Sequence, residues 1–324
     1  MVRFGVIGAG KIAQTFANAV QKMGGNLYAI ASRDLSKAKD YQLQYGYEKA
    51  YGSYELMLQD PMVDCVYIAT PHGLHAEHMM LALDHGKHVL CEKSFTLNTE
   101  QAKRVLEKAK SKNLFVMEAM WTKYLPVMIE TKRLIETGLI GDIKSLDVSF
   151  GFDAEHRRGS RLFDPAMGGG ALLDIGVYVI TCATYFLGLP RKIQSTAELD
   201  STNGFDLEEK IHFQYEHAHA DLKCSLLQKL DNIARIQGTH GSVEIIDFWK
   251  AEHATFYNLK HEIIHEVRIP HVINGFEYQI KGVISSIENH LLESPVITHQ
   301  STLDVMNLMD TLRKSWGLKF PNET

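Results

Sequence analysis

Short apolar runs alternate with longer amphipathic stretches along the first 120 residues. The apolar runs predict strands at Val2–Ile7, Leu27–Ala31, Asp64–Thr70, His88–Cys91 and Leu114–Met117. The amphipathic stretches predict helices at Lys11–Met23, Leu35–Tyr45, Gly73–His85 and Glu100–Lys112. Strands that are apolar throughout, each followed by a helix, predict a parallel sheet covered on both faces. The first part of the chain is therefore expected to form a doubly wound α/β fold of the Rossmann type.

The pattern changes near residue 120. A helix is predicted at Pro126–Glu136, a strand at Ile143–Phe152 and a long helix at Gly170–Phe186. Further strands are predicted at Lys192–Leu199, Lys210–Tyr215, Ala220–Leu227, Ala234–Gly238, Val243–Ile246 and Ala254–Asn258, and two last helices at Phe276–Leu292 and Thr302–Trp316. Successive strands with short polar breaks predict a mostly antiparallel sheet. We expect a dinucleotide-binding domain at 1–120 and an α+β domain for substrate binding and dimerisation at 121–324.

The composition narrows the class of protein. A length of 324 residues suits two domains, and 45% hydrophobic residues are typical of a globular chain. The net charge of −5 provides no field that attracts nucleic acid or anionic lipid. We expect no membrane span, no signal peptide and a cytoplasmic location. The cysteines are expected to be buried free thiols because they lie far apart in apolar stretches, at Cys65, Cys91, Cys182 and Cys224.

A glycine motif marks a candidate phosphate site after the first predicted strand. Gly8 and Gly10, followed by Ala13, match G-x-G-x-x-A at the point where the strand ends and a helix begins. Gly8 permits a tight turn, Gly10 lets a pyrophosphate approach the backbone, and Ala13 lets helix and strand pack closely. The helix N-terminus at Lys11 and Ile12 would meet the phosphate charge. The alternative is a plain strand–helix turn.

The end of the second predicted strand bears on the choice between NAD and NADP. Ser32, Arg33 and Lys37 could bind a 2′-phosphate through a hydroxyl and two cations. Asp34 is the competing residue, because NAD enzymes place an acid here to bind the ribose hydroxyls. It stands just before a helical run, however, where an aspartate is often an N-cap. We predict NADP, with NAD as the alternative.

Two groups of histidines resemble metal motifs. His261 to His265 read H-E-x-x-H, which zinc proteases carry on a helix. The surrounding alternation of apolar and charged residues predicts a half-exposed strand instead, on which the two imidazoles would stand too far apart for one ion. His72, His75 and His78 follow the central predicted strand, and we expect no metal there either.

The loop after the central strand is a second candidate cofactor segment. Thr70, Pro71, His72 and His75 are expected to lie near the nicotinamide, because ligands bind at the carboxyl ends of parallel strands. His78 is expected to be an ordinary residue on a helix surface.

Two further motifs carry candidate catalytic residues. Glu92 and Lys93 follow the strand His88–Cys91, and a lysine desolvated at that position suits proton transfer. Asp174 and Tyr178 lie four residues apart in a predicted helix and so share a face. A surface ion pair is the alternative for Glu92 and Lys93.

At this point the sequence resembles the glucose–fructose oxidoreductase and inositol dehydrogenase (Gfo/Idh/MocA) family, and most closely its dihydrodiol and D-xylose dehydrogenase branch. The matching stretches occur in family order over both halves of the chain: GVIGAGKIA, ATPHGLH, CEKSF, EAMWTKYLP and GGGALLDIGVY. The resemblance implies a dehydrogenase or reductase that acts on CH–OH groups with NAD(P).

The resemblance also implies roles for individual residues. Lys93 matches a lysine that contacts the nicotinamide ribose and the substrate and assists proton transfer. Tyr178 matches the tyrosine of the dihydrodiol dehydrogenase branch and would serve as the acid or base, and Asp174 would orient the substrate or the lysine. Residues that would contact the substrate are Trp121, Lys123 and Arg161. The family's proline after the lysine is Ser94 here, so the preceding peptide bond is either trans or a cis bond that neighbouring structure enforces.

The predicted function is hydride transfer between a nicotinamide and a secondary hydroxyl or carbonyl group. Sugars, polyols and trans-dihydrodiols all present such a group, and the sequence does not choose among them. A homodimer is expected, because an antiparallel sheet needs its outer face covered. Two alternatives are a nucleotide-binding sensor or scaffold without turnover, and an enzyme that recycles bound NAD in non-redox sugar chemistry.

Overall fold

The computed structural model describes residues 1–321 and 323, which form two compact units. The first unit comprises Met1–Trp121 and Val272–Leu303, and the second comprises Thr122–His271 and Asp304–Glu323. One helix, α9 (His299–Ser315), begins in the first unit and ends in the second. Each unit has its own sheet.

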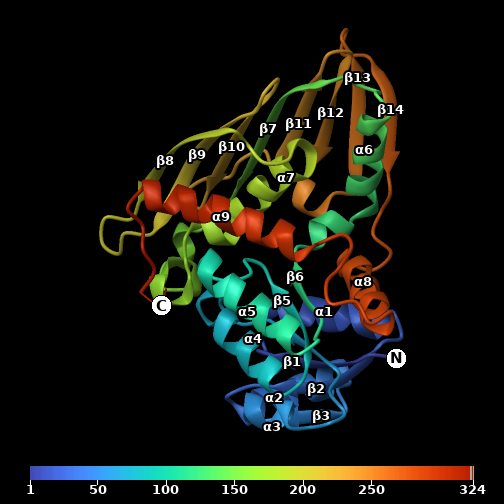
Figure 1. The fold of residues 1–324 in the computed structure, drawn as a ribbon, viewed down its shortest axis with the longest axis vertical. Coiled ribbons are helices and arrows are strands. Elements are labelled where there is room, and N and C mark those ends of the chain that lie inside the picture. Colours follow the sequence, from blue (N-terminus) through green and yellow to red (C-terminus); the bar gives the residue numbers. More distant parts are fainter. Residues whose placement is uncertain (322, 324) are drawn as a thin grey trace. The chain divides into compact units, whose positions relative to one another are not determined.

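The sheet of the first unit has six parallel strands in the order β3-β2-β1-β4-β5-β6 (Figure 1). The strands are β1 (Arg3–Ile7), β2 (Asn26–Ala31), β3 (Lys49–Tyr51), β4 (Cys65–Ile68), β5 (His88–Glu92) and β6 (Val116–Ala119). This order confirms the predicted doubly wound fold. Because the chain reverses its direction of travel between β1 and β4, the loops after these two strands flank the position where such folds bind ligands.

Helices pack on this sheet, and several begin at side-chain caps. They are α1 (Lys11–Lys22), α2 (Leu35–Tyr45), α3 (Tyr54–Leu58), α4 (His75–Asp84) and α5 (Thr99–Ser111), and α8 (Phe276–Glu288) packs on α1. Asp34, Ser53 and Asn98 cap α2, α3 and α5 by accepting hydrogen bonds from amides of the first turn. On the core side of α1, Phe16 stacks on Tyr67 of β4 with ring centroids 3.9 Å apart.

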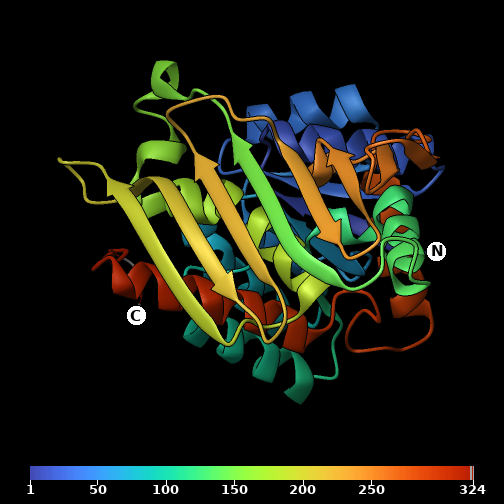
Figure 2. The ribbon, with the colours of Figure 1, turned by 90° about the horizontal axis from the view of Figure 1, so that it is seen from above.

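The sheet of the second unit has eight strands in the order β14-β13-β12-β11-β7-β10-β9-β8 (Figure 2). They are β7 (Ile143–Gly151), β8 (Lys192–Leu199), β9 (Asp206–Gln214), β10 (His219–Ser225), β11 (Ile233–Gly238), β12 (Gly241–Ile246), β13 (His253–Asn258) and β14 (Ile263–Arg268). All pairs are antiparallel except β7 with β10. The prediction of a mostly antiparallel sheet is confirmed.

The helix predicted at Gly170–Phe186 has two parts. A π-helical turn covers Leu172–Gly176, and α7 (Val177–Leu187) continues from it and packs on β7 and β10. A further α-helix of this unit is α6 (Pro126–Glu136), which packs on β13 and β14.

Among the residues that the structure describes, Pro165–Leu187 is the one helical stretch long and apolar enough to cross a membrane. The expectation that the chain has no membrane span stays a prediction. The structure buries 78% of its most apolar window inside the protein, as expected of a core helix.

Two local predictions concern candidate metal ligands and thiols. The H-E-x-x-H segment lies in the β13–β14 hairpin, with His261 in the turn at φ 59° and His265 on β14. The strand prediction is confirmed for Ile263–Arg268 but not for His261, which lies in the turn, and the two histidines do not share a helical face. The four cysteines are free and buried, as predicted.

Candidate functional site

The turn between β1 and α1 has the shape of a phosphate cradle. Gly8 has φ +98°, and a Cβ there would lie 3.0 Å from the carbonyl oxygen of Ala69. A Cβ at Gly10 would instead have that same oxygen 4.0 Å away as its nearest neighbour, so the turn leaves space at this position. Gly10 is the N-cap of α1 and contributes no side-chain cap. The amides of Lys11 and Ile12 therefore fit the pyrophosphate of a dinucleotide.

The carboxyl end of β2 presents two cations. Asp34 Oδ1 accepts hydrogen bonds from the amides of Ser36 and Lys37 at 2.9 and 3.4 Å, which confirms the N-cap interpretation of this aspartate. Arg33 and Lys37 are both exposed, and neither has an ion-pair partner among residues 1–321 and 323. The nearly buried Ser32 hydroxyl accepts a hydrogen bond from the Asp34 amide. This donor set fits a 2′-phosphate.

The loop after β4 is held by two histidines. The ring nitrogens of His75, which is fully buried, each lie 2.8 Å from a backbone oxygen, of Thr70 and of Ser94. His78 Nδ1 lies 2.9 Å from the Thr70 hydroxyl, and its side chain is 6% exposed. His78 is therefore not the surface residue that the sequence predicted. Its helical position turns toward Thr70 and the ring of Tyr54, which it meets edge-on at 4.9 Å.

Pro71 and His72 continue this loop. Pro71 precedes the short 3-10 turn His72–Leu74, and His72 is 3% exposed. The rings of His72 and His75 meet edge to face, with centroids 5.6 Å apart. These residues form the packed wall of the loop between Thr70 and α4.

Glu92 and Lys93 lie at the carboxyl end of β5, as predicted. The Tyr67 hydroxyl donates a hydrogen bond of 2.5 Å to Glu92 Oε1, and Lys93 is half-buried. The Lys93–Ser94 peptide bond is cis. Glu118 of β6 accepts a hydrogen bond from the Phe95 amide at 3.1 Å, so a buried carboxylate holds the chain two residues beyond the lysine.

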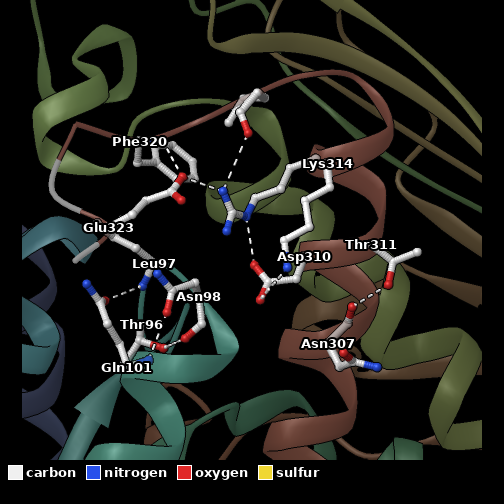
Figure 3. Close-up of polar contacts among 12 residues, drawn as sticks. Thr96, Leu97, Asn98, Gln101, Asn307, Asp310, Thr311, Lys314, Phe320 and Glu323 are labelled. Carbon is white, nitrogen blue, oxygen red and sulfur yellow. Dashed lines mark hydrogen bonds and ion pairs between the residues drawn. The ribbon is translucent and has the colours of Figure 1, made fainter.

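The segment that follows is fixed by the cap of α5 (Figure 3). Asn98 Oδ1 accepts from the Gln101 amide at 2.8 Å, and Gln101 Oε1 accepts from the Leu97 amide at 3.2 Å. The Thr96 hydroxyl donates to the Asn98 carbonyl oxygen at 2.8 Å. The backbone on the carboxyl side of Lys93 is thus restrained by side chains at several successive positions.

The second unit brings three predicted residues onto one stretch of chain. Arg161 Nη2 lies 3.1 Å from Asp174 Oδ1, so one of the predicted substrate residues and the predicted orienting carboxylate form an ion pair. Tyr178, in the first turn of α7, meets the ring of Phe150 edge-on at 5.6 Å. Phe150 in turn stacks on Trp249 at 5.2 Å. Aromatic side chains from β7 and from the turn after β12 thereby fix the Tyr178 ring.

Sequence profiles of one known family match most of the chain. The oxidoreductase family with an NAD-binding Rossmann fold, GFO/IDH/MocA, matches residues 2–120, and the GFO/IDH/MocA C-terminal domain matches residues 128–244. The chain belongs to this family. It is an oxidoreductase, and the resemblance of its motifs is confirmed.

Characterised members of the GFO/IDH/MocA family align over the full length. The chain is 31% identical to the trans-1,2-dihydrobenzene-1,2-diol dehydrogenases of Mus musculus and Homo sapiens, over 99% of each chain. The enzyme of the same name from Xenopus tropicalis is 32% identical over 98% of this chain and 99% of its own.

Solved structures of the family share the fold. A 3-ketoreductase from Actinomadura kijaniata, in complex with NADP and TDP-benzene, is 26% identical and has a TM-score of 0.88 over 97% of both chains. A levoglucosan dehydrogenase in complex with NADH is 21% identical, with a TM-score of 0.87 over 98% of this chain and 97% of its own. The ketoreductase has also been solved with a tyrosine replaced by phenylalanine and with a lysine replaced by alanine.

The predicted site residues of this family member divide between the two units. The cofactor candidates and Lys93 all lie in the first unit, together with Trp121, whose ring packs on Phe276 at 4.9 Å. Lys123, which is half-buried, lies in the second unit with Arg161, Asp174 and Tyr178.

Sequence reasoning missed four supporting residues. Tyr67 donates a hydrogen bond to Glu92, and His78 lies within hydrogen-bond distance of Thr70. Glu118 accepts a hydrogen bond from the Phe95 amide, and Trp249 stacks on Phe150. Of these four residues, only Glu118 could have been identified from the sequence, because a charged residue inside an apolar strand indicates a buried polar contact.

Proposed function

We propose that this oxidoreductase uses NADP(H) and acts on a secondary hydroxyl or carbonyl group of a sugar, polyol or trans-dihydrodiol. The observation that carries the cofactor assignment is the β1–α1 turn, where Gly10 leaves space in front of uncapped amides. The exposed Arg33 and Lys37 favour the 2′-phosphate of NADP over the free ribose hydroxyls of NAD. Asp34 favours it too, because its carboxylate is engaged as a helix cap.

The remaining donors of the first unit would hold the other parts of the cofactor. The loop Thr70–His75 and Glu92 would lie against the nicotinamide half, as the carboxyl ends of β4 and β5 require. When bound, the nicotinamide supplies a centre that accepts or donates hydride. The chain's own residues then have to orient the substrate and move one proton.

Tyr178 and Lys93 are assigned to that proton. In the oxidative direction the Tyr178 phenolate takes the proton of the substrate hydroxyl group and becomes the phenol, and the Lys93 ammonium supports this transfer by favouring the phenolate. The ion pair with Arg161 holds the Asp174 carboxylate in one orientation. Packing against Phe150 limits the motion of the Tyr178 ring, so the transferring oxygen is held in place.

The substrate class follows from the relatives. Dehydrogenases of trans-dihydrodiols are similar to this chain over its full length, and a 3-ketoreductase shares its fold. The name of the first describes ring carbons that carry hydroxyl groups, and the name of the second describes a keto group. Trp121, Lys123 and Arg161 are proposed to contact this ring.

Replacing either proton-transfer residue tests the function. Tyr178→Phe and Lys93→Met should each lower kcat by about 100-fold or more, because general acid–base catalysis contributes about this much. NADPH binding, followed by nicotinamide fluorescence, should stay within about threefold of the wild type. Lys110→Met on the exposed face of α5 is the matched control and should leave both quantities unchanged. Full turnover in both test variants would remove Tyr178 and Lys93 from the mechanism.

We also propose a cytoplasmic location and a homodimer. The four buried free thiols suit a reducing compartment. Figure 2 shows the second sheet from the face opposite α7. A groove of about 550 Å³ on this sheet has a lining that includes acids at Asp147 and Asp221 and bases at Lys210 and Arg235. Two copies related by a twofold axis could pair these opposite charges.

A further inference from the structure

Two buried carboxyl groups lie against the π-helical turn that carries Asp174. Asp206 and Glu209 are both on β9, and both have an exposure of 0%. The turn Leu172–Gly176 packs directly on β9 and on its neighbour β10. Buried acids are rare unless their oxygens are hydrogen-bonded, so each carboxylate oxygen of Asp206 and Glu209 is expected to have a partner.

Asp206 holds the beginning of the helix. Its Oδ2 accepts a hydrogen bond of 2.5 Å from the Leu172 amide, which is one of the amides that the helix itself leaves unsatisfied. The approach is close enough that a Cβ at Gly170 would lie 2.5 Å from Asp206 Oδ1. Gly170, at φ +113°, is therefore required where the chain passes the carboxylate. A carboxylate at a helix N-terminus is stabilised as the anion.

One carboxylate oxygen of Glu209 has a hydrogen-bond donor and the other does not. Its Oε2 accepts a hydrogen bond from the Sγ–H of Cys224, the residue opposite it on β10. Glu209 Oε1 and Asp206 Oδ1 are buried and have no hydrogen-bond donor among the described residues. Two ionised carboxylates would leave both of these oxygens unsatisfied, at the full cost of burying them.

A single proton on Glu209 satisfies both oxygens. With that proton, Glu209 Oε1 becomes a donor, and Asp206 Oδ1 is the acceptor that lacks a partner. Hydrogen bonds then run from the Cys224 thiol through Glu209 to Asp206, which also accepts from the Leu172 amide. We propose that Glu209 is protonated at neutral pH and that the Glu209–Asp206 pair is a positioning element that fixes the π-helical turn, which bears Asp174 and leads into α7 with Tyr178.

The electrostatic surroundings agree with this geometry. Burial raises the pKa of the Glu209 carboxyl well above its ordinary value, and the Asp206 charge raises it further. Glu208 on the same strand and Cys224 on β10 are the other titratable groups near it, and burial raises the pKa of the thiol as well. The β8 residue paired with Glu209 is Ala197, which does not titrate. Asp174, on the π-helical turn, is bound by Arg161.

The neighbouring Glu208 gives a matched control. Burial alone would raise the pKa of Glu208, but Gln228, Ser225 and Lys223 lower it below its ordinary value overall. The two adjacent glutamates thus have opposite shifts. Replacing each by glutamine, which is uncharged and nearly isosteric, should have opposite effects on the pH dependence of stability.

Infrared spectroscopy tests the proton directly. At pH 7 the wild-type protein should show the carbonyl stretch of a protonated carboxylic acid, and Glu208→Gln should retain this band. Glu209→Gln should lose it. Absence of the band from the wild type, or its survival in Glu209→Gln, would overturn the assignment of the proton to Glu209.

Thermal melting between pH 5 and pH 9 gives a second readout. A raised folded pKa means that stability is present below the unfolded value and is lost as pH rises through the folded value. The melting temperature of Glu209→Gln minus that of the wild type should therefore increase with pH. For Glu208→Gln the same difference should not increase. Parallel slopes for the two variants would contradict the proposal.

The positioning role rests on the proposed function and is tested by turnover. Glu209→Leu, which cannot donate to Asp206, should lower kcat at least fivefold, and Glu209→Gln should restore most of it because the amide can donate. NADPH binding should not change in either variant, since the cofactor residues lie in the first unit. Equal kcat for Glu209→Leu and the wild type would remove the positioning role. A wild type without turnover would instead count against the proposed function, and the infrared and melting results would still decide the proton.

Discussion

A single carboxylate joins two strands and a loop of the first unit. Asp60 Oδ2 accepts hydrogen bonds from Tyr28 at 3.0 Å, Lys49 at 2.7 Å and Tyr51 at 2.6 Å, and its Oδ1 accepts from the Met62 amide at 2.9 Å. Burial alone would raise the pKa of Asp60, but these donors outweigh it and hold the pKa well below its ordinary value. The stabilisation is therefore present above about pH 4 and is lost as pH falls toward the folded pKa.

Replacing this aspartate should have a pH-dependent cost. Asp60→Asn should lower the free energy of unfolding by about 2 kcal/mol at pH 7, because donors lose a charged acceptor. The loss should shrink as pH falls below about 4. Chemical denaturation at several pH values measures this, with Asp40→Asn, on the exposed face of α2, as the control. A loss of equal size at every pH would show that charge is not the cause.

Residue types and spacing point to the candidate site residues but not to the residues that support them. Lys93, Asp174 and Tyr178 lie in motifs that a sequence displays, whereas His78 and Trp249 act through contacts with residues distant in the chain. His78 occupies a helical position that reads as exposed. It is buried because α4 packs beside Thr70 and Tyr54, and the local sequence does not show these tertiary contacts.

The β1–α1 turn contains two glycines with different roles: Gly8 is required by the fold, and Gly10 is proposed to be required for cofactor binding. Gly8→Ala should destabilise the fold by about 1–3 kcal/mol, because φ +98° and the nearby Ala69 oxygen both oppose a side chain. Gly10→Ala should leave stability within about 0.5 kcal/mol, since the position is open and its φ of −109° suits alanine. It should nevertheless weaken NADPH binding at least about 10-fold.

The measurements are a denaturation curve and a fluorescence titration for each variant. Gly10→Ala that binds NADPH as tightly as the wild type would show that the turn does not hold a pyrophosphate. Gly8→Ala with unchanged stability would show that the turn tolerates a side chain, and the steric account of Gly8 would fail.

Most elements could be predicted because their periodicity is strong. The ranges of α2, α6 and β8 agree with the sequence prediction residue for residue. The short elements β3 and α3 were missed, because three to five residues are too few to show the helical or the strand periodicity of apolar positions. The π-helical turn was also missed, since one extra residue per turn leaves no mark in an apolar stretch such as 172–176.

At the scale of the whole molecule, the chain returns to its first unit. The Val116 amide donates to the Leu292 carbonyl oxygen at 3.1 Å, and His299 Nε2 lies 3.0 Å from the Val116 carbonyl oxygen. The returning segment thus covers the outer edge of β6, which is the last strand of its sheet. The sequence prediction of domains at 1–120 and 121–324 did not place this late segment in the first unit. Local sequence patterns do not indicate which sheet edge a segment far along the chain will cover.

The proposed homodimer is a further prediction at this scale. The groove on the outer face of the second sheet carries Asp147 and Asp221 beside Lys210 and Arg235, and paired copies would neutralise these charges. Light scattering at low salt should give twice the mass of one chain, and the dimer should weaken as salt screens the charges. A monomer mass at all concentrations would end this proposal.

We propose that the first unit binds NADP(H) and that Arg33 selects it over NAD(H). The most direct test titrates NADPH and NADH in parallel against the wild type, Arg33→Ala and the control Lys39→Ala, which is also exposed on α2. NADPH should bind the wild type and the control at least about 10-fold more tightly than NADH, and Arg33→Ala should lose this preference. Equal affinities for the two cofactors in the wild type would contradict the selection of NADP, and binding of neither would contradict the account as a whole.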